Sequence, residues 1–434
     1  MMTHSTAKPL IALSPLRFNA EWINSVFTRA NRVWIGFSGG VDSHVLLHAL
    51  VNQISTAQKQ KLTVLHVHHG LSANADDWLR HCESIAENLA VSFVAERVQL
   101  DAQASLENAA RNARYQAFQT VMADQDVILL AHHAGDQVET VLFRLLRGTG
   151  GKGLIGIPQE RQLGDGHARL IRPLLMASKA DIEVYAKQHQ LVWIEDESNH
   201  DERFSRNFLR HRVVPVLTAR FPAMERNIVS SSQRMATDYA MLSQFAQQQL
   251  AVWCNAFGGL DLSYIANKPV DERLFWWRHF LQANGVSLTQ AQLESVEAMF
   301  SAAQDKQPEF VFSHGRIMRH QNAIYLLPPD EGVILATLMS GVRVTRSFDC
   351  ISVSGNGCAL KARPQSESLL MTNGKTRKLK KWLNDEVIPS WWRDHLPYVY
   401  QGDTLVAIGD LWCHPHYSHL NIQWQVSAIL PFPR

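Results

Sequence analysis

The chain has 434 residues, 46% of them hydrophobic, and a formal net charge of +2. No apolar run approaches the roughly 18 residues of a membrane-spanning helix, and the polar stretch 1–9 lacks the apolar region of a secretory signal. These features predict a cytoplasmic globular protein of two or three domains that does not enter a membrane. Five scattered cysteines without a Cys-x-x-Cys pair argue against a disulfide framework, a zinc ribbon and a cysteine-bound iron–sulfur cluster.

The first strongly patterned segment is the apolar run Val33–Phe37, followed by Ser38-Gly39-Gly40-Val41-Asp42-Ser43. The run predicts a buried parallel strand, and apolar residues at helical spacing after it predict a helix that reaches Leu50. The glycines between them let the backbone approach a phosphate, while the helix start offers N–H groups and a positive dipole end. Ser38 and Ser43 add hydroxyl donors, and Asp42 is suited to hold Mg²⁺. An ordinary strand–helix turn is the alternative.

This loop differs from the Gly-x-x-x-x-Gly-Lys-Ser/Thr loop because no lysine follows the glycines. Further strands are expected at 62–67, 91–94 and 127–131, and further helices at 76–90, 105–122 and 136–146. Such alternation predicts an α/β fold, a Rossmann-like parallel sheet with helices on both faces. Ligands of these sheets bind at the carboxyl ends of the strands, where Ser38–Ser43, His66–Gly70 and His132–Glu139 fall.

The second half of the chain has a different composition. A further α/β stretch spans about 169–217, and residues 223–300 are predicted to be helical, with the aromatic residues of 275–280 in a packed core. Short alternating runs after about residue 341 predict a small α+β domain. We therefore expect three domains: a catalytic α/β domain at 1–220, a mainly helical domain at 221–330 and a C-terminal α+β domain at 335–434.

Two histidines and two acids follow the strand at 127–131, in the segment His132-His133-Ala134-Gly135-Asp136-Gln137-Val138-Glu139-Thr140. We expect the helix to begin near Asp136, with Asp136 and Glu139 on one face of its first turn. Capping of the helix would explain a single acid there. Two acids and two histidines beside a phosphate loop favour a functional site, in which the carboxylates bind Mg²⁺ or receive the ammonium group of an amine nucleophile.

Arginines and histidines near the predicted strand ends allow two interpretations each. Glu107, Arg111 and Arg114 share a helical face, either as a solvated ion-pair lattice or as a guanidinium fork for phosphate. The histidines of His66-Val67-His68-His69 are expected to line a nucleotide pocket and not to bind structural zinc.

Two basic clusters stand out, and each is either a solvated face or a contact for a polyanion. The first contains Arg203, Arg206, Arg210 and Arg212 on a predicted helix. The second contains Lys375, Arg377, Lys378, Lys380 and Lys381 beside Trp382.

The motifs continue with Arg147-Gly148-Thr149-Gly150, Arg172-Pro173-Leu174-Leu175 and Asp196-Glu197-Ser198-Asn199 through Arg206-Asn207-Phe208-Leu209-Arg210. In this order the set resembles the tRNA(Ile)-lysidine synthase family of N-type pyrophosphate-loop (PP-loop) ATPases. The resemblance is specific over about residues 30–220 and looser through Lys378–Trp382 and Ile388–Arg393.

The resemblance implies a ligase that uses ATP and Mg²⁺. Its substrates would be free L-lysine and an isoleucine tRNA with a CAU anticodon. The C2 oxygen of the wobble cytidine is adenylated, and the lysine ε-amine then displaces AMP to form lysidine. The product reads AUA instead of AUG, and the tRNA changes its identity from methionine to isoleucine.

The resemblance also implies roles for residues. Ser38, Gly39, Gly40, Val41, Asp42 and Ser43 would hold the ATP phosphates, with Asp42 near Mg²⁺. Arg111 would lie by the nucleotide or the activated base, and His133, Asp136 and Glu139 would line the lysine and adenylate site. We expect Lys378, Lys380 and Lys381 to contact tRNA, whereas Arg206 and Arg210 either contact tRNA or are structural. The chain departs from the family pattern at Gly135, usually an aspartate, and at Ser72, often an arginine.

Three other functions would account for parts of the sequence. A tRNA thiolase shares the loop, but the chain lacks paired cysteines. A small-molecule synthetase, such as an NAD or GMP synthetase, would leave the second half without a role. A non-catalytic tRNA-binding protein does not explain the intact loop and acids. The sequence leaves open a homodimer, the group that deprotonates lysine and the bases read on the tRNA.

Overall fold

The computed structural model describes residues 11–12, 16–70, 74–98, 106–164, 166, 168–195, 197, 201–301, 308–330, 332, 335–427 and 429–433, with only the backbone described for 11, 12 and 106–108. The chain divides into two compact units, Met1–Ala240 and Met241–Arg434. The division into three domains at 1–220, 221–330 and 335–434 stays a prediction.

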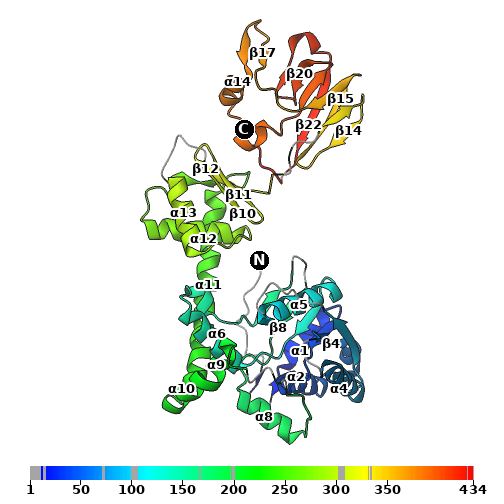
Figure 1. Cartoon of the computed structure of the whole chain (residues 1–434), viewed down its shortest axis with the longest axis vertical. Helices are drawn as coiled ribbons and strands as arrows, with labels where there is room; N and C mark the ends of the chain where they lie inside the picture. The colour runs from blue at the N-terminus through cyan, green and yellow to red at the C-terminus, as the bar shows by residue number, and fades with distance from the viewer. Residues whose placement is uncertain are drawn as a thin grey trace. The chain divides into compact units, whose positions relative to one another are not determined.

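Unit 1, whose strands β4 and β8 are labelled in Figure 1, is built on a six-stranded sheet. The order of its strands is β5-β4-β3-β6-β8-β7. Its strands are β3 (Val33–Gly36), β4 (Leu62–His68), β5 (Ser92–Arg97), β6 (Val127–Leu129), β7 (Glu160–Gln162) and β8 (Arg169–Ile171). Every neighbouring pair is parallel except β7–β8, and Ile35 lies opposite Val64 on one side and Leu129 on the other. The predicted parallel sheet is confirmed. A separate two-stranded pair consists of β1 (Ile11–Ala12) and β2 (Arg17–Phe18).

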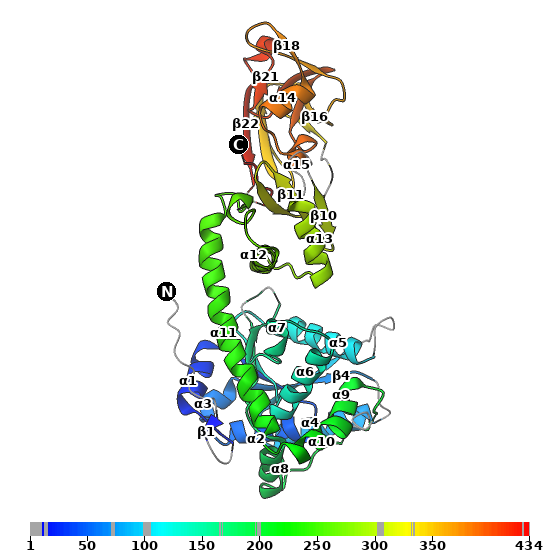
Figure 2. The same cartoon turned by 90° about the vertical axis from the view of Figure 1, so that its left-hand side faces the viewer.

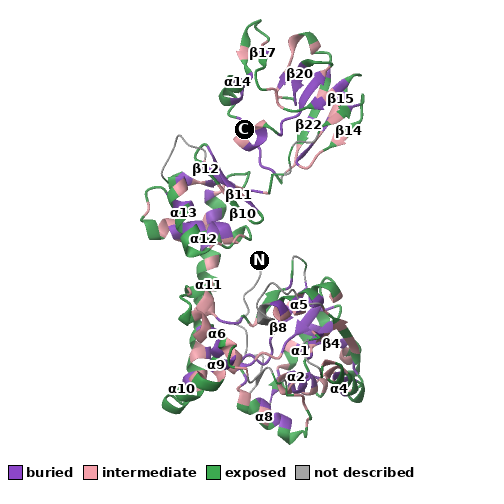
Figure 3. Cartoon of the chain, in the orientation of Figure 1, coloured by how far each residue is buried: buried purple, intermediate pink, exposed green. Residues whose placement is uncertain are grey.

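Helices cover both faces of this sheet, as predicted. In unit 1 they are α1 (Ala20–Arg29), α2 (Val41–Val51), α3 (Thr56–Gln60), α4 (Ala75–Asn88), α5 (Leu106–Val121), α6 (Ala134–Leu146), α7 (Gly151–Leu154), α8 (Lys179–Gln188), α9 (Ser205–Phe208), the π-helix η2 (Leu209–Val213), α10 (Val214–Arg220) and the first turns of α11 (Met224–Trp253). Val33 and Ile35 share a core with α1, α2, α4 and α8, while Trp34 faces Phe118 of α5. Because both faces are covered, β3 and β4 are almost entirely buried. Figure 3 shows this for β4.

The strand order creates a switch point beside β3. After β3 the chain builds the sheet in one direction through β4 and β5, and then returns to add β6 and β8 on the other side. In open α/β sheets the ligand crevice lies at the carboxyl ends of the two strands that flank such a reversal. Ser38–Ser43 follow β3 and His132–Glu139 follow β6, so the fold brings these two segments together.

Unit 2 begins with helices and a small sheet. The end of α11, α12 (Val270–Ala283) and α13 (Gln290–Ser301) pack around the buried Trp276, Trp277 and Phe280, which confirms the predicted aromatic core. The sequence did not predict the antiparallel sheet beside them, whose order is β10-β11-β12-β9. Its strands are β9 (Leu260–Asp261), β10 (Glu309–Phe312), β11 (Gly315–His320) and β12 (Ala323–Leu327), with the 3₁₀-helix η3 (Leu262–Tyr264) after β9.

The C-terminal part of unit 2 is α+β, as predicted. Antiparallel sheets with the orders β13-β16-β19-β20-β21 and β14-β15-β22 and a hairpin β17-β18 surround Trp382, Trp392 and Tyr398. The elements are β13 (Ala336–Leu338), β14 (Arg343–Thr345), β15 (Asp349–Ser354), β16 (Cys358–Lys361), β17 (Ser368–Leu370), β18 (Thr376–Lys378), α14 (Leu379–Asp385), α15 (Ser390–Arg393), β19 (Tyr398–Gln401), β20 (Thr404–Ile408), β21 (Trp412–Cys413), η4 (Pro415–Tyr417) and β22 (Asn421–Val426). Among the helices of the described residues, none has both the length and the apolar composition of a membrane span.

Candidate active site

The loop between β3 and α2 has the geometry of an anion site. Gly39 has φ +85°, and a Cβ there would lie 2.9 Å from Ile194 Cδ1 and 3.0 Å from Cys82 Sγ, so only glycine fits. Ser43 Oγ accepts a hydrogen bond from the Ser38 amide at 3.3 Å and donates one to the Gly40 carbonyl at 3.0 Å. Gly40 is the N-cap of α2 and supplies no capping side chain. The first amides of α2, beginning at Val41, therefore face the loop without a side-chain cap.

Asp42, in the first turn of α2, is the carboxylate of this loop. Its Oδ1 accepts a hydrogen bond from Lys179 Nζ at 2.6 Å, and its Oδ2 lies 3.9 Å from His133 Nε2. Lys179 is the first residue of α8 and was missed in the sequence analysis. No local pattern could have revealed it, because 137 positions separate the two residues.

His133 lies between the phosphate loop and the acidic residues of α6. Its Nδ1 accepts from the Gly135 amide at 3.0 Å, and its own amide donates to Asp136 Oδ2 at 3.0 Å, which makes a reciprocal cap. With Nδ1 assigned as the acceptor, the neutral ring carries its proton on Nε2. This Nε2 is 3.9 Å from Asp42 Oδ2 and 3.7 Å from Asp136 Oδ2.

The same cap moves the start of α6 to Ala134, two residues before the predicted start near Asp136. Asp136 is therefore a capping residue, as the alternative interpretation proposed, and it also approaches His133. Glu139 lies in the second turn of the helix, so its predicted place in the first turn was wrong. The His133 ring explains why residue 135 is a glycine. A Cβ at this position would lie 2.7 Å from Cε1 of that ring.

Arg210 holds the acidic pair of α6. Its guanidinium donates to Glu139 Oε1 at 2.6 Å and Oε2 at 2.9 Å, and lies 3.6 Å from Asp136 Oδ1. Burial raises the pKa of the Glu139 carboxyl, and Arg210 opposes that rise. Burial also acts to raise the pKa of Asp136, but His133 and Arg210 outweigh it and lower that pKa overall. Asp136 is therefore the more acidic carboxyl of the two.

Arg206 and Arg210 are both tied to α6. Arg206 Nη2 donates to Thr140 Oγ1 at 2.9 Å, one position beyond Glu139. Figures 1 and 2 show α9, α10 and the first turns of α11 beside α6, and Gln137 Nε2 of α6 donates to Ser232 Oγ of α11 at 2.8 Å. These bonds favour a structural role for the two arginines, while their contact with tRNA stays a prediction.

Arg111 belongs to a group of cations near the end of β6. Its guanidinium carbon lies 5.3 Å from the centre of the Tyr115 ring. Arg172, only 2% exposed, donates from Nε to His132 Nδ1 at 3.3 Å. Burial lowers the pKa of His132 to about 3, and Arg172 and Arg111 add to the lowering while Asp136 opposes it. His132 is therefore a neutral histidine in an environment dominated by arginines.

His66 and His68 of β4 have separate partners, whereas His69, just after the strand, has a buried Nδ1 without a hydrogen-bond partner among the described residues. His66 Nδ1 is 2.9 Å from the Phe37 carbonyl, at the start of the phosphate loop. His68 Nε2 is 3.2 Å from Asp76 Oδ1. Burial and Arg114 lower the pKa of His69 to about 4. The role of these histidines in a nucleotide pocket stays a prediction.

Some residues of the predicted motifs lie outside the described part of the chain. They are Ser72, the side chain of Glu107, and residues 196 and 198–200.

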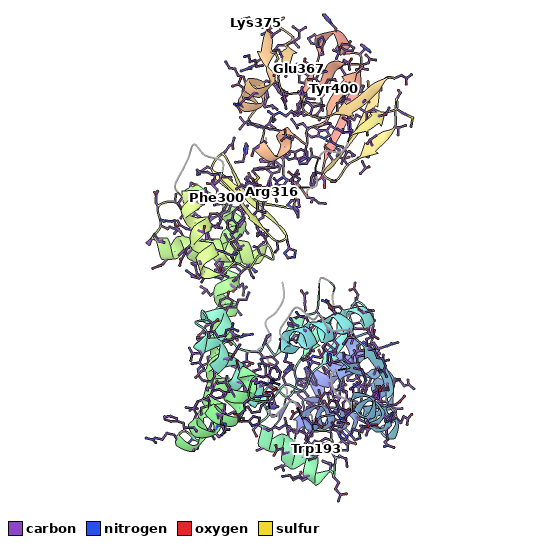
Figure 4. All side chains as sticks on the ribbon, viewed as in Figure 1. Trp193, Phe300, Arg316, Glu367, Lys375 and Tyr400 are labelled. Atoms are coloured by element: carbon purple, nitrogen blue, oxygen red, sulfur yellow. The ribbon has the colours of Figure 1, made fainter. Side chains whose placement is uncertain are left out.

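The second basic cluster is exposed on unit 2. Lys378, Lys380 and Lys381 are exposed at the start of α14, whose other side buries Leu379 and Trp382. Arg377 forms an ion pair with Asp385, whereas no ion pair in the described part of unit 2 involves the three lysines. Lys375, labelled in Figure 4 near β17, extends the same exposed surface.

Comparison with protein families identifies the class of each part. Residues 16–217 match the PP-loop domain, residues 277–325 the TilS substrate binding domain and residues 358–427 the TilS substrate C-terminal domain. The parallel sheet, the Ser38–Ser43 loop and the first of these matches define unit 1 as a PP-loop ATPase domain.

Relatives along nearly the whole chain define the family. A tRNA(Ile)-lysidine synthase of Pseudomonas syringae pv. tomato is 34% identical, over 93% of this chain and 92% of the relative. Those of Coxiella burnetii and Proteus mirabilis are 33% and 34% identical, over 88% and 86% of this chain and 90% of each relative. The chain belongs to the tRNA(Ile)-lysidine synthase family, and it is a ligase.

Proposed function

We propose that this enzyme joins free L-lysine to C2 of the wobble cytidine in the CAU anticodon of tRNA(Ile), at the cost of ATP, in the cytoplasm. The C2 oxygen attacks the α-phosphorus and the bond to diphosphate breaks. The lysine ε-amine then adds to C2, its nitrogen gives up one proton, and the bond from C2 to the adenylated oxygen breaks so that AMP leaves with the former C2 oxygen. The product is lysidine, which pairs with A and changes the tRNA identity from methionine to isoleucine.

One observation carries the proposal. His133 Nε2 lies 3.9 Å from Asp42 of the phosphate loop and 3.7 Å from Asp136 of the acidic pair. The carboxylate assigned here to the phosphates and Mg²⁺ and the carboxylate assigned here to the amine thus both lie within 4 Å of one imidazole nitrogen. Both segments lie at the switch point of the sheet, where such folds bind ligands.

The residues of the loop fit ATP and Mg²⁺. The uncapped start of α2 suits phosphate, and the positive φ of Gly39 lets the backbone turn close to it. Within the described residues, no group of three or more His, Cys, Asp or Glu side chains is placed to hold a metal. Mg²⁺ commonly binds through one or two carboxylates together with substrate phosphates, and Asp42 would supply such a carboxylate. Bound there, Mg²⁺ would neutralise charge that develops on the departing diphosphate.

The acidic pair supports amine binding. Arg210 already neutralises Glu139 through two hydrogen bonds. Asp136, whose pKa is lowered, stays ionised at neutral pH and is the carboxylate best suited to receive the lysine ammonium group. His132, neutral because of burial and nearby arginines, adds no positive charge that would repel this ammonium.

The exposed lysines support tRNA binding. Lys378, Lys380 and Lys381 have no acidic partner within the described part of unit 2, so their charges are available to phosphates. We assign these lysines, and not Arg206 or Arg210, as the stronger candidates for electrostatic contact with the tRNA backbone. Arg111 remains a candidate for contact with the nucleotide or the activated base.

A label-transfer experiment separates the two chemical steps. The protein is mixed with Mg²⁺, ATP labelled at the α-phosphate and a CAU-anticodon tRNA(Ile) transcript, without lysine. We expect label to become attached to the tRNA, and added lysine to release it as AMP. A tRNA that never acquires label, although lysine still enters the RNA, would contradict the adenylated intermediate.

A further inference from the structure

Lys179 of α8 forms an ion pair with Asp42 of the phosphate loop, and its place in α8 is unusual. Among the ion pairs of unit 1, this one joins the first turns of two different helices, α2 and α8, at the phosphate loop. A helix N-terminus favours acids because its dipole end is positive, so a lysine as the first residue of α8 works against the local field. The position of Lys179 therefore needs a reason outside its own helix.

The fold fixes this lysine at the loop from both ends of its helix. Ser178 caps α8, with its Oγ accepting from the Asp181 amide at 3.1 Å. Beyond the helix, the Ile194 amide donates to the Gly39 carbonyl at 3.0 Å, inside the phosphate loop. In the middle of the helix, the Tyr185 hydroxyl lies 3.1 Å from His48 Nδ1 of α2. These contacts hold α8 against α2 and keep Lys179 beside the loop.

Charge gives the reason for this placement. The polyphosphate of ATP is a polyanion, and Asp42 places a negative charge inside the site that must receive it. The Lys179 ammonium neutralises that charge at 2.6 Å, yet its side chain is still 39% exposed and can turn toward an added anion. The loop has no lysine after its glycines, so the fold supplies from α8 the cation that the loop sequence lacks.

We propose that Lys179 is a polyphosphate-binding residue of this PP-loop, whose ammonium group binds the part of ATP that leaves as diphosphate. This inference rests on the proposed use of ATP. The alternative is a purely structural ion pair that fastens α8 to α2.

The test is the affinity of the full chain for ATP and for AMP, measured by calorimetry with Mg²⁺ present. Lys179→Met removes the charge and keeps a long side chain. Loss of one charge-assisted contact should weaken ATP binding roughly tenfold to a hundredfold, while AMP, which lacks the β- and γ-phosphates, should change less than about threefold. Lys187→Met, an exposed lysine in the last turn of the same helix, is the matched control and should match wild type.

The outcomes are distinct. An ATP affinity of Lys179→Met equal to that of wild type, with or without a lowered melting temperature, would overturn the inference and leave a structural ion pair. Equal weakening of ATP and AMP would also overturn it, because the lysine would then not act on the departing phosphates. Absence of ATP binding by the wild-type chain would instead contradict the proposed function itself.

Discussion

The PP-loop site of unit 1 and the lysine surface on α14 of unit 2 use positive charge in opposite ways. In the first, Arg210 and Lys179 each pair with a carboxylate, Glu139 and Asp42 respectively, at 2.6 Å. In the second, Lys380 and Lys381 are exposed, and the described part of the unit gives them no acidic partner. A cation paired with a buried carboxylate fixes the position of that carboxylate and shifts its pKa. Unpaired cations on a surface attract a polyanion, and the affinity that they provide falls as the salt concentration rises. The comparison predicts that substitutions in unit 1 affect chemistry and folding, and that those on α14 affect tRNA affinity.

The largest effect is expected for Asp42→Ala. Without this carboxylate the loop loses its candidate Mg²⁺ ligand and the partner of Lys179, so AMP release should fall at least about a hundredfold. Affinity for tRNA, measured by filter binding, should stay within about twofold. Asp77→Ala, an exposed acid on α4, serves as control and should leave both quantities unchanged. Near-wild-type AMP release by the Asp42 variant would contradict the assignment of the phosphate site.

The next effect concerns folding and its pH dependence. Arg210→Met leaves the buried Glu139 without its partner and should lower the free energy of unfolding by about 2 kcal/mol at pH 8. A carboxyl whose folded pKa exceeds its unfolded pKa contributes stability at low pH that is lost as the pH rises through the folded pKa. Loss of Arg210 raises the pKa of Glu139 further, so the deficit should be smaller at pH 5 than at pH 8.

Urea denaturation at the two pH values measures this deficit. Arg212→Met is the matched control, because its partner Glu202 is exposed, and it should cost less than about 1 kcal/mol at both pH values. A deficit for Arg210→Met that grows toward pH 5 would show that Glu139 is not the group left unpaired.

The lysine surface should respond differently. Replacement of Lys378, Lys380 and Lys381 by alanine should weaken tRNA binding roughly tenfold and reduce the slope of log affinity against log salt by about 2. Arg377→Ala is the control from the same cluster, and its effect should be smaller because Asp385 already pairs with that arginine. If the triple variant binds tRNA as tightly as wild type at two salt concentrations, this surface does not contact tRNA.

The smallest effect is expected at Gly135. Its replacement by alanine brings a Cβ within 2.7 Å of the His133 ring, which must turn away and lose its bond to the amide of residue 135. We expect AMP release to slow by roughly threefold to tenfold, because the His133 ring then no longer lies between Asp42 and Asp136. Gly151→Ala, where a Cβ meets nothing within 4 Å, should be neutral. A wild-type rate for Gly135→Ala would show that this position of His133 is not needed.

The sequence predicted those parts of the fold that depend on local pattern. The buried run at 33–37 and the glycines after it required only neighbouring residues, and strand, loop and helix all form there. The start of α6 was missed by two residues because a histidine acts as its cap, which composition rules do not anticipate. The sheet β10-β11-β12-β9 was missed because its strands are short and follow helices.

The pairing of site residues was largely beyond sequence reasoning. Lys179–Asp42 and Arg210–Glu139 join positions 137 and 71 residues apart, so their contact depends on how the helices pack on the sheet. Spacing placed Asp136 and Glu139 on one helix, but only the fold distinguishes them. Arg210 donates to Glu139 from two nitrogens, Nε and Nη2, and only approaches Asp136.

Incorporation of labelled lysine tests the central claim most directly. The protein is incubated with ATP, Mg²⁺, radiolabelled L-lysine and an unmodified CAU-anticodon tRNA(Ile) transcript, and the label in the RNA is counted. We predict ATP-dependent incorporation that disappears when the wobble cytidine is replaced. Absence of label in the RNA, with AMP still released when tRNA is added, would contradict lysine as the nucleophile.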